Sequence, residues 1–212
     1  MWSIVDQIWG GYKLHEDVES LREEILTSPW YEQPSDADDS LLRLAIGATD
    51  LEAVRMLLSI GERPSVPSKD GSSLLHQAVD HVSGSSTLRE RDRALAILAS
   101  LLDYGADPNV YGMDGSPLHR AAGAGCIDAA QILLSHGANI EMRTLVDGER
   151  TPLIHAALMQ QPKMVRFLLS AGASKNTAIS CTLTDGPTTL QEVLTKENTP
   201  VSKDILSALN SM

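Results

Sequence analysis

The sequence predicts an all-α fold, a solenoid of stacked helix pairs joined by β-turns or short hairpins. Three observations lead to this prediction: a unit that recurs four times, an apolar stripe at helical spacing in each copy, and a glycine that closes each copy. Recurrence at a fixed period of a few tens of residues is typical of repeat architectures, in which each unit packs mainly on its neighbours.

The repeat is measured from a leucine near the start of each copy to a glycine near its end. The leucines are Leu42, Leu75, Leu118 and Leu153, and the glycines are Gly61, Gly105, Gly137 and Gly172. The leucine-to-glycine separations are 19, 30, 19 and 19 residues, and the separations from each glycine to the next leucine are 14, 13 and 16. The underlying period is therefore 33 residues, and the second copy carries an 11-residue excess.

Each copy is expected to form two short helices. The first follows a hydroxyl residue whose side chain can accept N–H groups of the first turn; these residues are Ser40, Ser73, Ser116 and Thr151. The second is an apolar stripe that stops at the closing glycine, because glycine readily takes positive φ. Asp-Gly pairs then predict turns, at Asp70-Gly71, Asp114-Gly115, Asp147-Gly148 and Asp185-Gly186.

These features resemble the ankyrin repeat, whose signature is Thr-Pro-Leu-His-x-Ala at a period of about 33 residues. The clearest copy runs from Ser116 through Pro117, Leu118 and His119 to Ala121. The resemblance covers residues 38–176 and, weakly, 185–209. It implies four repeats, at about 38–67, 68–110, 111–142 and 143–176.

Two copies depart from this signature. Arg43 replaces the histidine in the first, and Ile154 replaces it in the fourth, where His155 is shifted by one position. We expect these two repeats to lose the helix-linking hydrogen bond of the motif histidine and to keep the fold.

The ends of the chain do not follow the regular repeat. Residues 1–37 hold Trp2, Trp9 and Trp30 and two apolar stripes, which predict a helical cap on the first repeat; an alternative is that some tryptophans stay exposed as interface anchors. Residues 177–212 are predicted to be a degenerate fifth repeat or C-terminal cap, with a first helix over 188–194.

The excess of the second copy is expected to form a loop near 80–86, followed by an extended helix over about 87–103. Thr87 and Glu90 fit a capping box at the start of that helix. A second irregularity is the long hairpin over 143–150, where Leu145 and Val146 at an exposed tip would be suited to contact a partner.

The net charge of −11 is concentrated at one end, because residues 1–39 hold 10 acidic and 2 basic side chains. This acidity is explained either by solubility or by a docking face for a basic partner. Both explanations disfavour binding to the phosphates of nucleic acid.

The composition also indicates where the protein is located in the cell and whether it forms oligomers. There is no apolar run of eighteen residues and no basic segment before an apolar core, so neither a membrane span nor a signal peptide is expected. Cys126 and Cys181 lie in unlike contexts, which favours reduced thiols and a cytoplasmic protein. We expect the protein to be a monomer on its own.

No motif points to catalysis, a cofactor or a metal. His76 and His119 occupy the motif position and are expected to be structural, and no histidine or cysteine pair has zinc-ligand spacing. We therefore expect a protein that is not an enzyme; an enzyme with an unrecognised site is the least favoured alternative.

The resemblance implies protein binding by the hairpin tips and first helices. Carried over position by position, the candidate residues are Lys69, Asp70, Ser72, Asp80, His81, Tyr111, Met113, Asp114, Asp147, Glu149, Arg150, Leu158 and Met159, and the acidic cap adds Glu16, Asp17, Glu23 and Glu24. The resemblance places Asp80 and His81 at the end of the first helix of repeat two. A short, acidic chain of such repeats looks like the immunity proteins that inhibit bacterial toxins; the alternative is a scaffold or adaptor that bridges other proteins.

Overall fold

The computed structural model describes residues 41–64, 72–112, 115–145, 149–175, 178–179, 188–197 and 199–211. The chain divides into two compact units, residues 1–107 and 108–212, and each is described by itself. The predicted cap over 1–37 and its three tryptophans lie outside the described residues.

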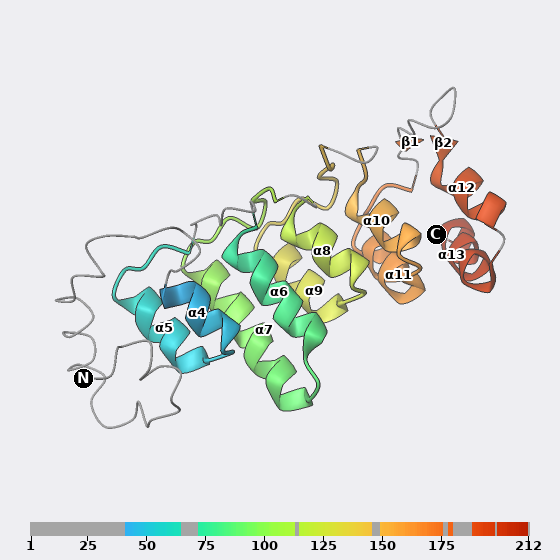
Figure 1. Cartoon of the computed structure of the whole chain (residues 1–212). Helices are drawn as coiled ribbons and strands as arrows, with labels where there is room; N and C mark the ends of the chain where they lie inside the picture. Colours follow the sequence, from blue (N-terminus) through green and yellow to red (C-terminus); the bar gives the residue numbers. More distant parts are fainter. Residues whose placement is uncertain are drawn as a thin grey trace. The chain divides into compact units, whose positions relative to one another are not determined.

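Within its described residues, the first unit contains two helix pairs (Figure 1). The first pair is α4 (Leu41–Gly47) and α5 (Leu51–Ser59), and the second is α6 (Leu74–Gly84) and α7 (Leu88–Asp103). Within each pair the two helices pack on each other, and between the pairs α4 packs on α6 and α5 on α7. First helices therefore stack on first helices, and second helices on second helices.

The second unit is also built from helix pairs, and its first helices α8 and α10 pack on each other. Its pairs are α8 (Pro117–Gly123) with α9 (Ile127–Ser135), and α10 (Pro152–Leu158) with α11 (Pro162–Ser170). Strands β1 (Ala178–Ile179) and β2 (Thr188–Thr189) pair antiparallel and lead into α12 (Leu190–Glu197) and α13 (Pro200–Ser211). Helix α13 packs on α11, and Arg166 pairs with Asp204 across that contact.

The helix starts follow the predicted capping chemistry. The Ser73 hydroxyl accepts the N–H of His76, and the Thr151 hydroxyl accepts the N–H of Ile154, both at 3.4 Å. Pro117 and Pro152 occupy first-turn positions, where the N–H that proline lacks would have no partner within the helix. The helix predicted over 188–194 starts later, at Leu190, because Thr189 caps it: the Thr189 hydroxyl accepts the N–H of Glu192 at 3.3 Å.

The closing glycines act as predicted. Each has a positive φ between 87° and 103°, and the N–H of the residue that follows it bonds to a carbonyl five residues back; these bonds are Glu62 to Leu57, Ala106 to Leu101, Ala138 to Leu133 and Ala173 to Leu168. This is the Schellman arrangement, which satisfies carbonyls that the end of a helix would leave unpaired. The four anchor leucines are fully buried.

The 11-residue excess of the second repeat is helix, so the loop predicted near 80–86 is wrong. The other three pairs combine a first helix of 7 residues with a second helix of 9, whereas α6 has 11 residues and α7 has 16. The extra 4 and 7 residues account for the whole excess. Asp80 and His81 therefore lie inside α6 and not at its end, because Val79 and Val82 are still buried and the helix continues to Gly84.

Arg43 takes over the hydrogen bond expected to be lost in the first repeat. In the third repeat, His119 Nε2 donates to the carbonyl of Arg150, the residue before the cap Thr151, at 2.9 Å. In the first repeat, Arg43 Nη2 donates to the carbonyl of Ser72, the residue before the cap Ser73, at 3.4 Å. The guanidinium therefore reaches the position that the motif imidazole reaches elsewhere, and the prediction of a lost bond is wrong for this repeat.

Replacing Arg43 tests this equivalence. We expect Arg43→Leu to lower the free energy of unfolding by about 1–2 kcal/mol, because a hydrogen bond from a charged donor is lost. Arg43→His should recover much of that loss. Urea denaturation followed by circular dichroism measures both. The exposed Arg55 is the control, since Arg55→Leu should stay within about 0.5 kcal/mol of wild type. Equal losses for the Leu and His variants would contradict the proposed equivalence.

Gly123 lets α10 approach α8 closely. A Cβ built on Gly123 would lie 2.7 Å from the ring of His155, and that ring packs edge-on to His119 with centroids 6.3 Å apart. Between them, the two rings fill the space beside the helix end.

Gly123→Ala is therefore expected to destabilise the second unit by about 1–3 kcal/mol, through overpacking against His155. The matched control is Gly84→Ala, which also changes the last residue of a first helix but meets nothing within 4 Å. That control should be neutral or stabilising by about 0.5–1 kcal/mol, because alanine is the better helix former. Thermal unfolding distinguishes the two, and similar melting temperatures for both variants would rule out the steric explanation.

Candidate protein-binding surface

The hairpin over 143–150 is held firmly at its base. The N–H of Thr144 donates to the carbonyl of Arg150 at 3.0 Å, and the N–H of Arg150 donates to the Thr144 hydroxyl at 2.9 Å. Thr144 is buried, although it lies in a connection between helices. These two bonds fix the pairing of the hairpin arms close to the body of the repeat.

Two side chains from the preceding repeat anchor the same hairpin. His119 donates to the Arg150 carbonyl through Nε2, while its Nδ1 accepts the N–H of Ser116 at 3.1 Å, which fixes the ring tautomer. On the other arm, the N–H of Leu145 donates to the hydroxyl of Tyr111. Leu145 and Arg150, which lie on either side of the part of the hairpin outside the described residues, are therefore both tied to the third repeat.

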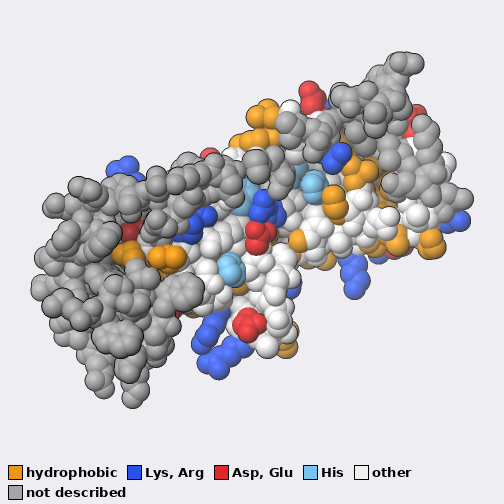
Figure 2. All heavy atoms as spheres, viewed as in Figure 1, with side chains coloured by type: hydrophobic (Ala, Val, Ile, Leu, Met, Phe, Trp, Pro, Cys, Tyr) orange, Lys and Arg blue, Asp and Glu red, His pale blue; other side chains and the backbone are white. Residues whose placement is uncertain are grey.

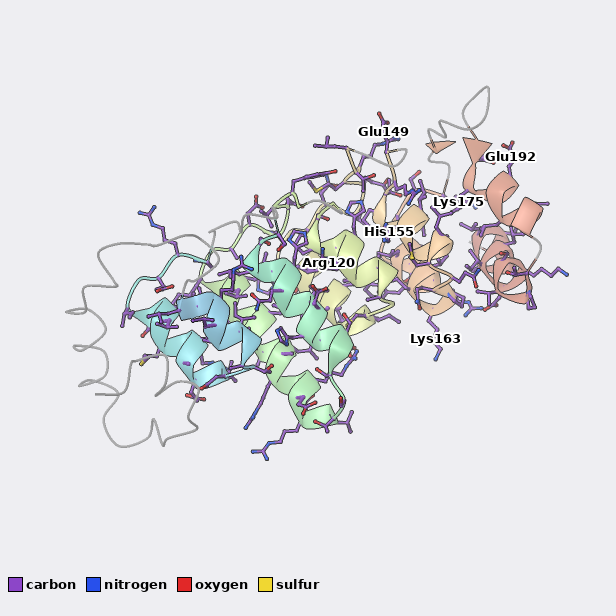
Figure 3. All side chains as sticks on the ribbon, in the orientation of Figure 1. Arg120, Glu149, His155, Lys163, Lys175 and Glu192 are labelled. Atoms are coloured by element: carbon purple, nitrogen blue, oxygen red, sulfur yellow. The ribbon has the colours of Figure 1, made fainter. Side chains whose placement is uncertain are left out.

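The anchored hairpin exposes an apolar side chain next to a charge pair. Leu145 is 80% exposed, and the Arg143 guanidinium lies 3.0 Å from the Glu149 carboxylate on the opposite arm. Glu149 has a φ of 53°, a left-handed conformation that is unusual for glutamate and marks a tight turn back into the arm. Figure 3 shows Glu149 at the outer edge of the second unit, beyond the ends of α8 and α10.

The first helices of the second unit add a mixed surface. Met159, the residue that caps α10, is 48% exposed, and Leu158 beside it is half-buried. Arg120 on α8 and His155 on α10 are also half-buried, and Figure 3 shows both on the side formed by these two helices. The exposed group of this surface is the Met159 thioether, whereas Arg120 and His155 already have interactions within the protein.

The remaining described candidates differ in exposure and in their hydrogen bonds within the fold. Asp80 is exposed and His81 half-buried, both on α6. Ser72 is half-buried and its carbonyl accepts the bond from Arg43, so it is engaged in the fold. Tyr111 and Arg150, in the second unit, are likewise engaged in holding the hairpin. These positions support the surface more than they offer free groups to a partner.

The other candidates lie outside the described residues and stay predictions. They are Lys69, Asp70, Met113, Asp114, Asp147, Glu16, Asp17, Glu23 and Glu24.

Two exposed residues were absent from the candidate list. Leu88 is 81% exposed at the first position of α7, and Arg143 forms the charge pair on the hairpin. The signal for Leu88 was available: the residue after a capping Thr87 points away from the apolar stripe, which starts at Ala94. The partner of Arg143 lies six residues away across the hairpin, and sequence spacing alone does not reveal it.

Among the described residues, no group of three or more His, Cys, Asp or Glu side chains could hold a metal ion, and no helix there is long and apolar enough to cross a bilayer. Burial raises the pKa of Glu62 above its ordinary value, and a backbone hydrogen bond with Leu42 offsets part of that effect. Glu62 follows the closing glycine of the first repeat, where its own N–H completes the helix stop.

Comparison with known proteins agrees with this geometry. Residues 90–179 match the family model for ankyrin repeats in three copies. The chain is 34% identical to the B-cell lymphoma 3 protein homolog of Mus musculus over 136 residues. This stretch covers 64% of this chain and 29% of that protein. It is 34% identical over 87 residues to ankyrin repeat and SOCS box protein 2 of Homo sapiens, covering 41% of this chain and 13% of that protein.

A bacterial protein is also similar. Protein PhlB of Serratia liquefaciens is 39% identical over 89 residues, covering 42% of this chain and 38% of that protein. In each of these three comparisons, the matched stretch spans less than two fifths of the relative's own length.

The stacked helix pairs, the glycine stops and the matched segment define a helical repeat protein of the protein-binding class. Residues 90–179 form a run of ankyrin repeats, and the described helix pairs have the arrangement of that repeat. Ankyrin repeats mediate protein–protein interaction, and the anchored hairpin and the first helices are the surfaces that this fold presents.

Tyr111→Phe tests the anchoring of the hairpin. The Leu145 N–H loses its acceptor in this variant, so its exchange with deuterium should accelerate about tenfold while the core of α10 keeps its protection. Tyr104→Phe is the matched control, because Tyr104 is half-exposed at the end of α7. Unchanged exchange at Leu145 in Tyr111→Phe would mean that the hairpin is held without this bond.

Proposed function

We propose that this chain is a non-enzymatic, specific binder and inhibitor of a basic protein partner, comparable to a bacterial immunity protein. The observation that supports it most is the anchored hairpin, which holds an 80% exposed leucine in a fixed place. Preorganised groups cost less conformational entropy when they bind, so a Leu145 whose backbone N–H is already bonded favours a specific complex.

The surface chemistry favours a protein as the ligand. Leu145 supplies an apolar contact on the hairpin that carries the Arg143–Glu149 charge pair, and Met159 supplies a second exposed apolar side chain at the end of α10. Apolar anchors within a polar rim are typical of protein interfaces.

The charge distribution favours a basic partner. Residues 1–39 carry a net charge of −8, from 10 acidic and 2 basic residues, within a total of −11. Such a field accelerates encounter with a positively charged protein and repels the phosphates of nucleic acid. Inhibition would follow if the bound chain covered the functional surface of that partner.

The alternative is a scaffold or adaptor that bridges two proteins. The division into two compact units favours it, because each unit exposes an apolar side chain of its own, Leu88 in the first and Leu145 in the second. An adaptor would bind two partners at once, whereas an inhibitor would bind one and abolish its activity.

We further propose that the protein works as a monomer in the cytoplasm. Cys126 is a buried free thiol at the start of α9, which fits a reducing compartment. Size-exclusion chromatography with light scattering tests the monomer, and fractionation of the source cell tests the location.

Leu145→Asp tests the binding surface. We expect the affinity for the partner recovered by co-purification from the source cell to fall about tenfold or more, because an interface anchor is replaced by a charge. Tyr104→Asp is the control at a half-exposed position in the other unit and should leave the affinity unchanged. Titration calorimetry measures both variants. Equal affinity of the wild type and Leu145→Asp for the partner would exclude the hairpin as a binding surface.

The charge argument has a separate test. Replacing Glu16, Asp17, Glu23 and Glu24 by lysine should slow association about tenfold at low salt, with less effect at high salt. An unchanged association rate at every salt concentration would show that these acidic residues do not contribute to association.

A further inference from the structure

The lengthening of α6 and α7 lies entirely at their shared end. Helix α6 starts directly after Ser73, as α8 starts after Ser116, and α7 stops before the closing Gly105, as α9 stops before Gly137. The added residues therefore extend the pair at its turn, and the 7 added to α7 correspond to about 10 Å of helix. We call residues 83–93 the spur.

The spur has its own stabilising interactions and no core. Packing ends at Val82 on α6 and at Ala94 on α7, and between them every side chain is exposed or half-buried. Glu90 Oε2 accepts the N–H groups of Ser86 and Thr87 at 3.0 and 3.2 Å, and the Ser85 hydroxyl donates to the carbonyl of His81 at 2.6 Å. A capping box thus keeps an otherwise solvated helix end ordered.

The groups offered at the tip are apolar and positive. Leu88 is 81% exposed. Arg89 and Arg93 are exposed and four residues apart, so they share one side of α7. The Glu90 carboxylate is occupied by the cap, which leaves Asp92 as the exposed acid beside them. Figure 2 shows Lys and Arg side chains projecting from the end of α6 and α7, on a chain whose net charge is −11.

We infer that the spur is a second docking point, which binds an acidic segment of a partner protein. Carboxylates of that segment pair with Arg89 and Arg93, and an apolar side chain of the same segment packs on Leu88. Arginine forks bind carboxylates in a two-pronged geometry, and the leucine supplies the apolar contact beside them. A polyanion such as nucleic acid would gain nothing from Leu88, so the leucine favours a protein segment that has an apolar side chain beside its carboxylates.

The spur is independent of the hairpin surface. It lies in the other unit, its charge has the opposite sign to that of residues 1–39, and it arises from the residues that exceed the family period. Binding at the spur therefore stands whether or not Leu145 binds the proposed inhibitor target.

The test uses the full chain and three short synthetic peptides, of glutamate and leucine, of glutamate and serine, and of lysine and leucine. Fluorescence anisotropy at physiological salt measures binding, since a screening length of about 8 Å suppresses repulsion by distant acids. We expect the glutamate–leucine peptide to bind at least about tenfold more tightly than the other two. Equal binding of the lysine–leucine peptide would overturn the proposal.

Variants locate the site. Arg89→Glu with Arg93→Glu should weaken binding of the glutamate–leucine peptide about tenfold, and Leu88→Ser should reduce it towards that of the glutamate–serine peptide. Lys163→Glu with Lys203→Glu makes the same charge change at exposed positions of the other unit and should leave binding unchanged. Equal losses for both double variants would mean that only net charge matters and would overturn the proposal.

Two further readouts complete the experiment. Circular dichroism verifies that each variant keeps its helix content; the spur has no buried side chain, so these changes leave the core intact. Light scattering detects self-association. A wild-type dimer that Leu88→Ser dissolves would make a second copy of the chain the occupant, and would overturn the proposal of an acidic partner.

Discussion

The hydrogen bond from a first helix to the carbonyl just before the next first helix is the constraint on which this protein depends. A helix of 7 residues is too short to be stable alone, so each pair needs its neighbour in a defined position. His119 and Arg43 supply that position with different donors, an imidazole and a guanidinium. In the third repeat, the accepting carbonyl of Arg150 also closes the hairpin with Thr144. The carbonyl that links the two repeats therefore also fixes the base of the hairpin that we propose as a binding surface.

Much of the fold was predictable because its determinants are local. The glycine stops, the hydroxyl caps and the buried leucines each follow from a few neighbouring residues, and the structure places them as predicted. Two predictions were wrong where a local signal admits two outcomes. Ser83 and Gly84 suggested a loop, but burial of Val82 extends the helix, and Thr189 ends a strand where a helix start was expected.

The candidate surface was less predictable, because exposure depends on long-range partners. The prominence of Leu145 was expected from the hairpin, but its anchors on Tyr111 and His119 lie about one repeat earlier in the sequence. Arg43 was taken for a missing donor, since spacing cannot show how far a guanidinium reaches. Leu88 was overlooked because the mixed charges after it are typical of a solvated helix start. The sequence therefore predicted the stacked helices better than it predicted the long-range hydrogen bonds and the exposed side chains.

The lengths of α6 and α7 have a consequence for the phase of the helices. The added 4 and 7 residues are close to one and two full turns, leaving rotational offsets of about 40° and 20° at about 100° per residue. Because the added residues lie at the turn, near-whole turns bring the end of α6 and the start of α7 back to nearly the direction they would have without the excess, so a short connection can still join them. An excess of, for example, two residues in each helix would have rotated these two ends by more than a right angle. The repeat thus tolerates growth in steps of about one turn, and its outermost end can vary in length while the stack behind it keeps its geometry.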